Sequence, residues 1–140
     1  MDIVDSLEPD FILGSDKKIK KKKKAVKVKE KVIGHKKAVL DLAWNNLNRN
    51  ILASCSADKS IILWDLEQLK QATKMKDNTE KVQSIKWHPV EAFTLLAGSS
   101  DKTVTLYDCR NPKTNKKIWN LNGETEQVVW NHFEPNNFLV

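Results

Sequence analysis

The chain has 140 residues, enough for one ordinary domain, and its net charge of +6 is unevenly distributed. Residues 1–31 hold ten lysines against six acidic residues, whereas residues 32–140 hold 14 basic and 12 acidic residues, so the basic character belongs mostly to the N-terminal segment. Because the sequence shows no apolar run of transmembrane length, no secretory signal and no Cys-x-x-Cys spacing, we expect a soluble protein in a reducing intracellular compartment.

The first 16 residues combine acidic residues with one apolar cluster over residues 10–14, Asp-Phe-Ile-Leu-Gly. Such a cluster cannot bury itself without a partner. We therefore interpret this segment as disordered, with a short docking peptide as the alternative.

A lysine run follows and contains no aromatic residue that could stack on a base. Like charges in such a block repel each other and keep the chain extended. The run is typical of a nuclear or nucleolar address, or of a sequence-independent contact to nucleic acid, and a solvated linker is an equally good interpretation. Its lysines are Lys17, Lys18, Lys20, Lys21, Lys22, Lys23 and Lys24.

Short apolar runs separated by turn residues then predict a series of β-strands. Alternation over residues 25–29 gives a weak strand, and stronger ones follow over residues 38–44, 51–55 and 60–64, with a less distinct outer strand near 72–75. Asparagines between the first two strong strands, and Asp58 between the next two, supply the turns.

The pattern then repeats with a period of 43 residues. Asp58 returns as Asp101, Trp64 as Tyr107, and a tryptophan recurs at positions 44, 87 and 130. A fixed period of this length predicts a repeat architecture. The second copy predicts strands over residues 81–87, 93–98, 103–107 and 117–121, and the third over 127–130 and 138–140. The third copy stops inside its second strand, so we expect a fragment.

The repeat resembles the WD-repeat family. Gly34-His35 before the first strand, Asp58 in the turn and Trp64-Asp65 at the end of the third strand carry the resemblance, whereas the second copy has Asn78 and Tyr107 at two of these places. The resemblance implies an all-β fold: a partial β-propeller of about two and a third blades behind a disordered basic tail. We assign residues 1–31 to the tail and 32–140 to the propeller, with repeats at about 34–76, 77–119 and 120–140.

The polar residues of the repeat include the types found in a serine-hydrolase triad, but the resemblance implies a different role. In WD repeats such residues form an internal network from the turn Asp to His, to Ser or Thr, and to the Trp indole. We expect His88 and His132 to be turn histidines, and we find no phosphate loop, acid–base carboxylate pair, metal or cofactor site. The predicted network residues are His35, Ser54, Ser56, Asp58, Trp64, Asp101 and Tyr107.

A closer resemblance, over residues 34–45, 62–65, 107–110 and 129–133, is to nucleolar WD-repeat proteins tied to ribosome biogenesis and ribosomal RNA transcription, with a link to histones. It implies a non-enzymatic scaffold in the nucleus, most of all the nucleolus, with protein or peptide partners on the propeller rim and a contact to nucleic acid or chromatin. It implies neither a membrane nor a small-molecule substrate. The alternatives are an adaptor of another complex and non-specific nucleic-acid binding through the lysine run.

Overall fold

The computed structural model describes residues 13–14 and 33–140. Several sequence-based predictions therefore lie outside the described residues: the weak strand over residues 25–29, the lysine run from Lys17 to Lys24, and the disorder of most of the tail. The division into a tail over residues 1–31 and a propeller over 32–140, with its three repeats, stays a prediction.

The described residues form strands and no helix, which confirms the predicted all-β fold. No helix among them is long and apolar enough to cross a membrane. The predicted outer strand near residues 72–75 begins two residues earlier, at Lys70. The strands are β1 (Val39–Trp44), β2 (Ile51–Ser56), β3 (Ile61–Asp65), β4 (Lys70–Met75), β5 (Val82–Trp87), β6 (Thr94–Ser99), β7 (Thr103–Asp108), β8 (Lys116–Asn120), β9 (Val129–Trp130) and β10 (Phe138–Leu139).

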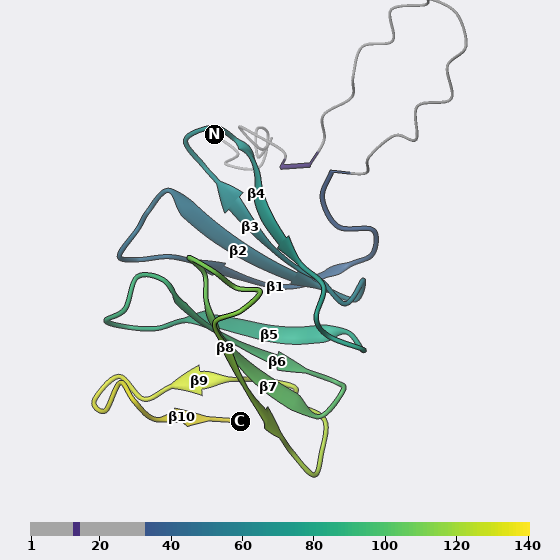
Figure 1. The fold of residues 1–140 in the computed structure, drawn as a ribbon, viewed down its shortest axis with the longest axis vertical. Coiled ribbons are helices and arrows are strands. Elements are labelled where there is room, and N and C mark those ends of the chain that lie inside the picture. Colours follow the sequence, from purple (N-terminus) through teal and green to yellow (C-terminus); the bar gives the residue numbers. More distant parts are fainter. Residues whose placement is uncertain (1–12, 15–32) are drawn as a thin grey trace, which may run out of the picture.

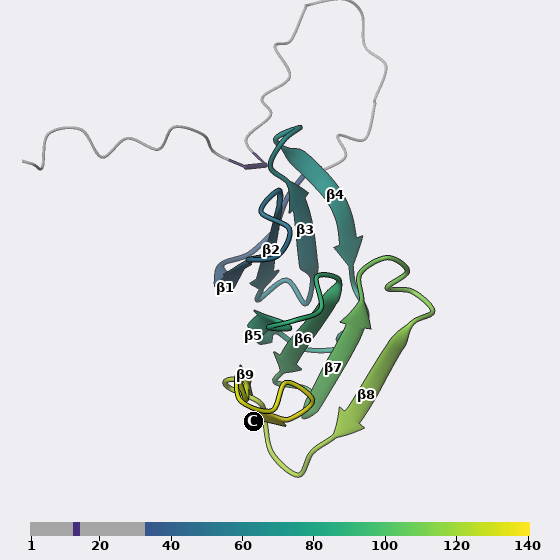
Figure 2. The ribbon, with the colours of Figure 1, turned by 90° about the vertical axis from the view of Figure 1, so that its left-hand side faces the viewer.

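The strands form consecutive blades of a partial β-propeller. Two four-stranded antiparallel sheets have the orders β1-β2-β3-β4 and β5-β6-β7-β8, and β9 pairs with β10 in a hairpin. Figure 1 shows the two sheets stacked one above the other with the hairpin below them, and Figure 2 shows the same stack from the side. We call the first sheet blade 1 and the second blade 2.

The two blades share local irregularities at positions one period apart. The register between the first two strands shifts between Val39 and Asp41 in blade 1 and between Val82 and Ser84 in blade 2. Lys59 and Lys102, one in the turn before the third strand of each blade, have φ angles of +67° and +66°. The repeated sequence therefore determines the position of the bulge and of the left-handed turn residue as well as the positions of the strands.

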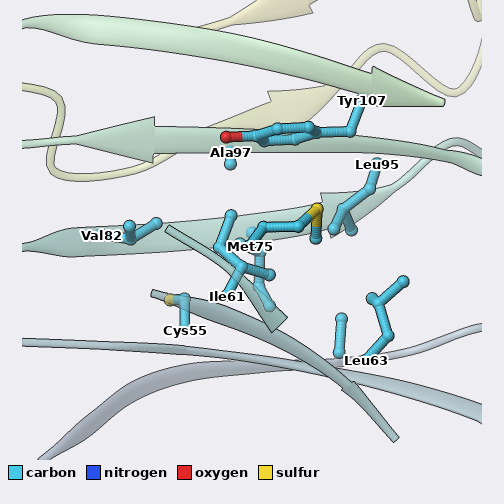
Figure 3. Close-up of a cluster of buried hydrophobic side chains, with 10 residues drawn as sticks. Cys55, Ile61, Leu63, Met75, Val82, Leu95, Ala97 and Tyr107 are labelled. Carbon is cyan, nitrogen blue, oxygen red and sulfur yellow. The ribbon is translucent and has the colours of Figure 1, made fainter. Parts of the chain in front are cut away.

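The main hydrophobic core lies between the blades. Strand β3 is buried on both faces, so it is apolar from Ile61 to Trp64, and alternate residues along it point toward blade 2. Figure 3 shows side chains from both sheets meeting in this layer. Its members are Ala53, Cys55, Ile61, Leu63 and Met75 from blade 1 and Val82, Ile85, Leu95, Ala97 and Tyr107 from blade 2.

The periodic tryptophans join neighbouring blades. The Trp87 indole donates to the carbonyl of Ala43 in blade 1, at 2.8 Å, and the Trp130 indole donates to the carbonyl of Lys86 in blade 2, at 3.2 Å. These donors and acceptors are each one period apart. Trp44, which is 62% exposed, instead donates to the carbonyl of Arg49 in its own loop. The 43-residue spacing of Trp87 and Trp130 therefore reflects a hydrogen bond that each of them donates to the preceding blade.

The packing of β6 against the third repeat depends on the absence of a side chain at Gly98. A Cβ atom at this position would lie 2.3 Å from Thr125 Cγ2 and 2.9 Å from Val128 Cγ1. Thr125 and Val128 are buried, so they have little room to move away.

We expect Gly98→Ala to lower the free energy of unfolding by about 1–3 kcal/mol because the added methyl group overpacks this site. Urea unfolding followed by circular dichroism measures the loss. Thr125→Ser removes the closest methyl group and should restore part of the stability in the double variant. Gly123→Ala is the control, because nothing lies within 4 Å of a Cβ there. Equal effects at Gly98 and Gly123 would contradict the packing described here.

Candidate functional site

The predicted network residues of blade 1 meet in a chain of hydrogen bonds. His35 stands in the segment before β1, and Asp58 lies in the turn between β2 and β3. The imidazole Nδ1 of His35 lies 3.1 Å from Asp58 Oδ1, and its Nε2 lies 2.8 Å from the hydroxyl of Ser54. The Trp64 indole donates to the same hydroxyl at 2.8 Å. The chain therefore links a loop, a turn and two strands.

The turn supplies a second set of contacts to Asp58. Its Oδ1 accepts from the backbone N–H of Ser60 at 3.1 Å, and its Oδ2 accepts from the backbone N–H of Lys36 at 2.8 Å. Ser56, which the sequence offered as an alternative to Ser54, joins the turn instead: its hydroxyl donates to the carbonyl of Lys37 and accepts from the N–H of Asp58. Asp58 thus holds the turn and the segment before β1 together.

The contacts determine how Asp58 titrates. Burial by itself would raise the pKa of this carboxyl, but hydrogen bonds from Ser60, the Lys36 N–H and His35 outweigh it and hold the pKa well below its usual range. The ammonium group of Lys74 adds an ion pair at 3.4 Å and also donates to the carbonyl of Gly34 at 2.7 Å. The contacts therefore favour the ionised form of Asp58.

This geometry is unsuited to nucleophilic catalysis. The Ser54 residue is 2% exposed, and its hydroxyl already accepts from the Trp64 indole. A nucleophile must reach a substrate and must be free to give its proton to a base. The network therefore acts within the blade, where it satisfies an indole N–H, a hydroxyl and an imidazole that would otherwise be buried without partners.

Blade 2 keeps the hydrogen bonds of the turn aspartate but lacks the serine hydroxyl that joins histidine and tryptophan in blade 1. Asp101 accepts from the N–H groups of Thr103, at 3.1 Å, and Thr79, at 3.0 Å, which repeats the contacts of Asp58. Ala97, however, stands one period after Ser54, so no hydroxyl joins the two ends. The buried Asn78 Nδ2 and Tyr107 hydroxyl make no hydrogen bond of ordinary geometry among the described residues. Asn78 and Thr105 nevertheless lie near enough to the Tyr107 hydroxyl to lower its pKa, but burial outweighs them and raises the pKa of Tyr107 to about 12.

Other polar residues with a clear role were missed from the sequence. The Asp41 carboxylate accepts from the N–H of Ile85 at 3.1 Å and from Lys86 Nζ at 2.8 Å, both in blade 2. Ser84, one period after Asp41, accepts in the same way from the N–H of Val128 at 3.4 Å. Aligning the copies at 43 residues would have paired Asp41 with Ser84, and also Ser54 with Ala97.

The remaining candidate ligands are dispersed. The His88 ring accepts at Nδ1 from the N–H groups of Val90 and Glu91, at 3.2 and 3.0 Å, and it packs edge-on against Trp130. His132 lies in the β9–β10 turn region. Burial raises the pKa of both thiols, Cys55 and Cys109, to about 12. Within residues 13–14 and 33–140, no three His, Cys, Asp or Glu side chains gather as a metal site would require.

One edge of the two blades carries exposed lysines. The segment before β1, the β2–β3 and β6–β7 turns and the β4–β5 connection meet there, because Lys36 and Thr79 donate backbone N–H groups to Asp58 and Asp101. Of the acidic side chains on these connections, Glu80 pairs with Lys59 at 3.3 Å and Asp77 pairs with Lys116 at 3.0 Å. We call this edge the lysine rim, formed by Lys36, Lys37, Lys59, Lys76, Lys81 and Lys102.

The family-model comparison agrees with this architecture. Two stretches, residues 27–65 and 69–108, match the model described as WD domain, G-beta repeat. Together they cover more than half of the chain. Each match ends at the Asp that closes the third strand of a blade, Asp65 or Asp108.

Curated proteins share parts of this sequence. The periodic tryptophan protein 1 homolog of Drosophila melanogaster is 40% identical over 84 residues, 60% of this chain and 17% of that protein. Periodic tryptophan protein 1 of Saccharomyces cerevisiae is 45% identical over 73 residues, 47% of this chain and 13% of that protein. Coronin-2B of Xenopus laevis is 50% identical over 36 residues, 26% and 8% of the two chains, which is less than one period. The chain spans under a fifth of the length of these relatives.

We expect Ser54→Ala to lower the free energy of unfolding by about 1–3 kcal/mol, because it leaves the Trp64 N–H and one His35 nitrogen buried without partners. Thermal and urea unfolding measure the loss, and Ser54→Thr, which keeps the hydroxyl, should retain most of the stability. Asn78→Ala is the matched control in blade 2, where the amide Nδ2 has no partner to lose among the described residues. Equal losses for Ser54→Ala and Asn78→Ala would contradict this role of the network.

Proposed function

The chain belongs to the WD-repeat family, and on this premise we propose that it is a non-enzymatic scaffold acting in the nucleolus, in ribosome biogenesis or in ribosomal RNA transcription or processing. The observation that carries the scaffold role is the use of the polar repeat residues. His35, Ser54 and Asp58 bond to one another and to the backbone, so they hold the blade in shape and leave its loops to face partners.

The same observation supports a location for the partner site. Loops carry most binding functions on rigid β scaffolds, and the lysine rim gathers loops from both blades on one edge. We assign protein or peptide partners to this rim. The nucleolar and ribosomal part of the proposal rests on the similarity to periodic tryptophan protein 1 in fly and yeast, and on the lysine run as an address.

A localisation experiment tests this assignment. We expect a fluorescent fusion of the full chain to accumulate in nucleoli, and residues 1–31 alone to carry a reporter into the nucleus. Replacing the seven lysines from Lys17 to Lys24 by glutamine should leave both fusions in the cytoplasm. The control replaces Lys70, Lys113 and Lys117, exposed lysines outside the lysine rim, by glutamine. Depletion of the protein should make ribosomal RNA precursors accumulate, and unchanged precursors would contradict the ribosomal role.

Charge on the lysine rim favours a second function, sequence-independent binding of nucleic acid. Six exposed lysines line this edge, and Lys36 follows the tail within the same segment of chain. Lysine contacts to phosphates release counterions, which gives affinity without sequence preference. On this proposal the lysine run and the lysine rim bind one strand together.

Salt dependence distinguishes this function from protein binding. We expect the full chain to bind single-stranded RNA of arbitrary sequence with an affinity that falls steeply with salt. Each lost phosphate contact should reduce the slope of log K against log salt by about 0.7. Changing Lys36, Lys59 and Lys102 to glutamine should lower the slope, whereas changing Lys70 and Lys113, at the opposite edge, should not. Equal slopes, or tighter binding to polyglutamate than to RNA, would overturn the proposal.

A further inference from the structure

The Leu13–Gly14 turn lies against blade 1, although these residues are 20 positions away from the segment that leads into β1. A Cβ atom built on Gly14 would lie 3.4 Å from the Cα of Gly34 and 3.4 Å from Cη2 of the Trp64 ring. The short purple segment stands beside the start of the blue segment in both views (Figures 1 and 2). The contact therefore joins two distant stretches of the sequence.

The surface that receives this turn is held in place by other contacts. Gly34 is buried, its N–H donates to the side chain of Gln71 at 3.3 Å, and its carbonyl accepts from Lys74 at 2.7 Å, both on β4. The Trp64 ring is fixed by its hydrogen bond to Ser54. A preformed surface loses little conformational freedom when a segment docks on it.

Comparison of the two blades shows that no described strand packs on the Trp64 face of blade 1. Tyr107, one period after Trp64, points toward blade 1 and is fully buried by the core between the blades. Trp64 is on the corresponding face of blade 1, where no described strand lies, yet it is only 4% exposed. The Leu13–Gly14 turn contacts this face at the edge of the Trp64 ring.

Both glycines suit a close approach of two backbones. Gly14 has a φ of +79° and Gly34 a φ of +96°, a region that side chains with a Cβ rarely adopt. A Cβ atom at either position would be in ordinary van der Waals contact with its neighbours, so the positive φ is what favours glycine there. Gly14 is exposed, and Leu13 beside it is half-buried.

We propose that the edge of blade 1 formed by Gly34 and Trp64 is a docking site for the chain's own Leu13–Gly14 turn. The docking brings residues 13–14 against the segment that leads into β1. The same edge bears the exposed Lys36, so the docking site lies beside the lysine rim.

Nuclear magnetic resonance on the full chain tests the contact directly. The protein has four glycines, so glycine labelled with ¹³C gives few signals to assign. We expect a nuclear Overhauser effect between the Gly14 α-protons and the Trp64 ring protons in the wild-type chain. Its absence would overturn the proposal, and this measurement does not depend on whether any variant folds.

Limited proteolysis with chymotrypsin tests the energetic side of the docking. Cleavage after Leu13 requires the turn to leave the blade, so its rate follows the undocked population. We expect Gly14→Val to accelerate this cleavage by roughly threefold or more. The rate is taken relative to cleavage of the same bond in a free peptide of residues 8–20 with the same residue at position 14, because this residue follows the scissile bond and changes its intrinsic rate. Gly123→Val, at an open position, should leave the ratio unchanged. An unchanged ratio in Gly14→Val would overturn the proposal, whatever the outcome of the RNA experiments.

Discussion

The hydrogen bond from the Trp64 indole to the Ser54 hydroxyl is the interaction on which blade 1 depends. It lies between the two inner strands of the sheet, so it fixes the ring plane of the largest side chain on that face. Because the same hydroxyl meets His35, the loop before β1 is tied to the same point. Asp58 continues the chain into the turn. A single buried hydroxyl thus sets the relative positions of a loop, a turn and two strands.

Blade 2 shows that apolar packing can replace this interaction. Ala97 removes the hydroxyl, and Tyr107 takes the place of the tryptophan, yet both side chains are buried in the layer against blade 1. The cost is that the buried Tyr107 hydroxyl and Asn78 amide make no hydrogen bond of ordinary geometry among the described residues. Blade 2 has neighbours on both of its faces, because Val104 packs with Val128 and Trp130 on the other side. Packing on two faces makes the polar network less necessary there.

The repeat period accounts for what could be predicted from the sequence. Strands and turns follow from local patterns that recur every 43 residues, so their positions were predicted to within about two residues. The period placed the tryptophans at one strand position, but the acceptors of their indoles, such as the Ala43 carbonyl, belong to another blade and depend on how the sheets stack. The docking of Leu13 and Gly14 was equally inaccessible. The apolar cluster in the charged tail was interpreted as disordered, with a short docking peptide as the alternative, and only the folded blade shows a place where such a peptide docks.

The network also determines the charge that the molecule presents at its edge. Asp58 and Asp101 come from the same turns as Lys59 and Lys102, so the sequence of each turn is nearly neutral. The two carboxylates, however, point inward and are occupied by backbone N–H groups, whereas the lysine side chains remain exposed. Hydrogen bonding inside the blade therefore separates charges that are adjacent in the sequence. The exposure of these lysines beside occupied carboxylates is a consequence of how the blade is held together.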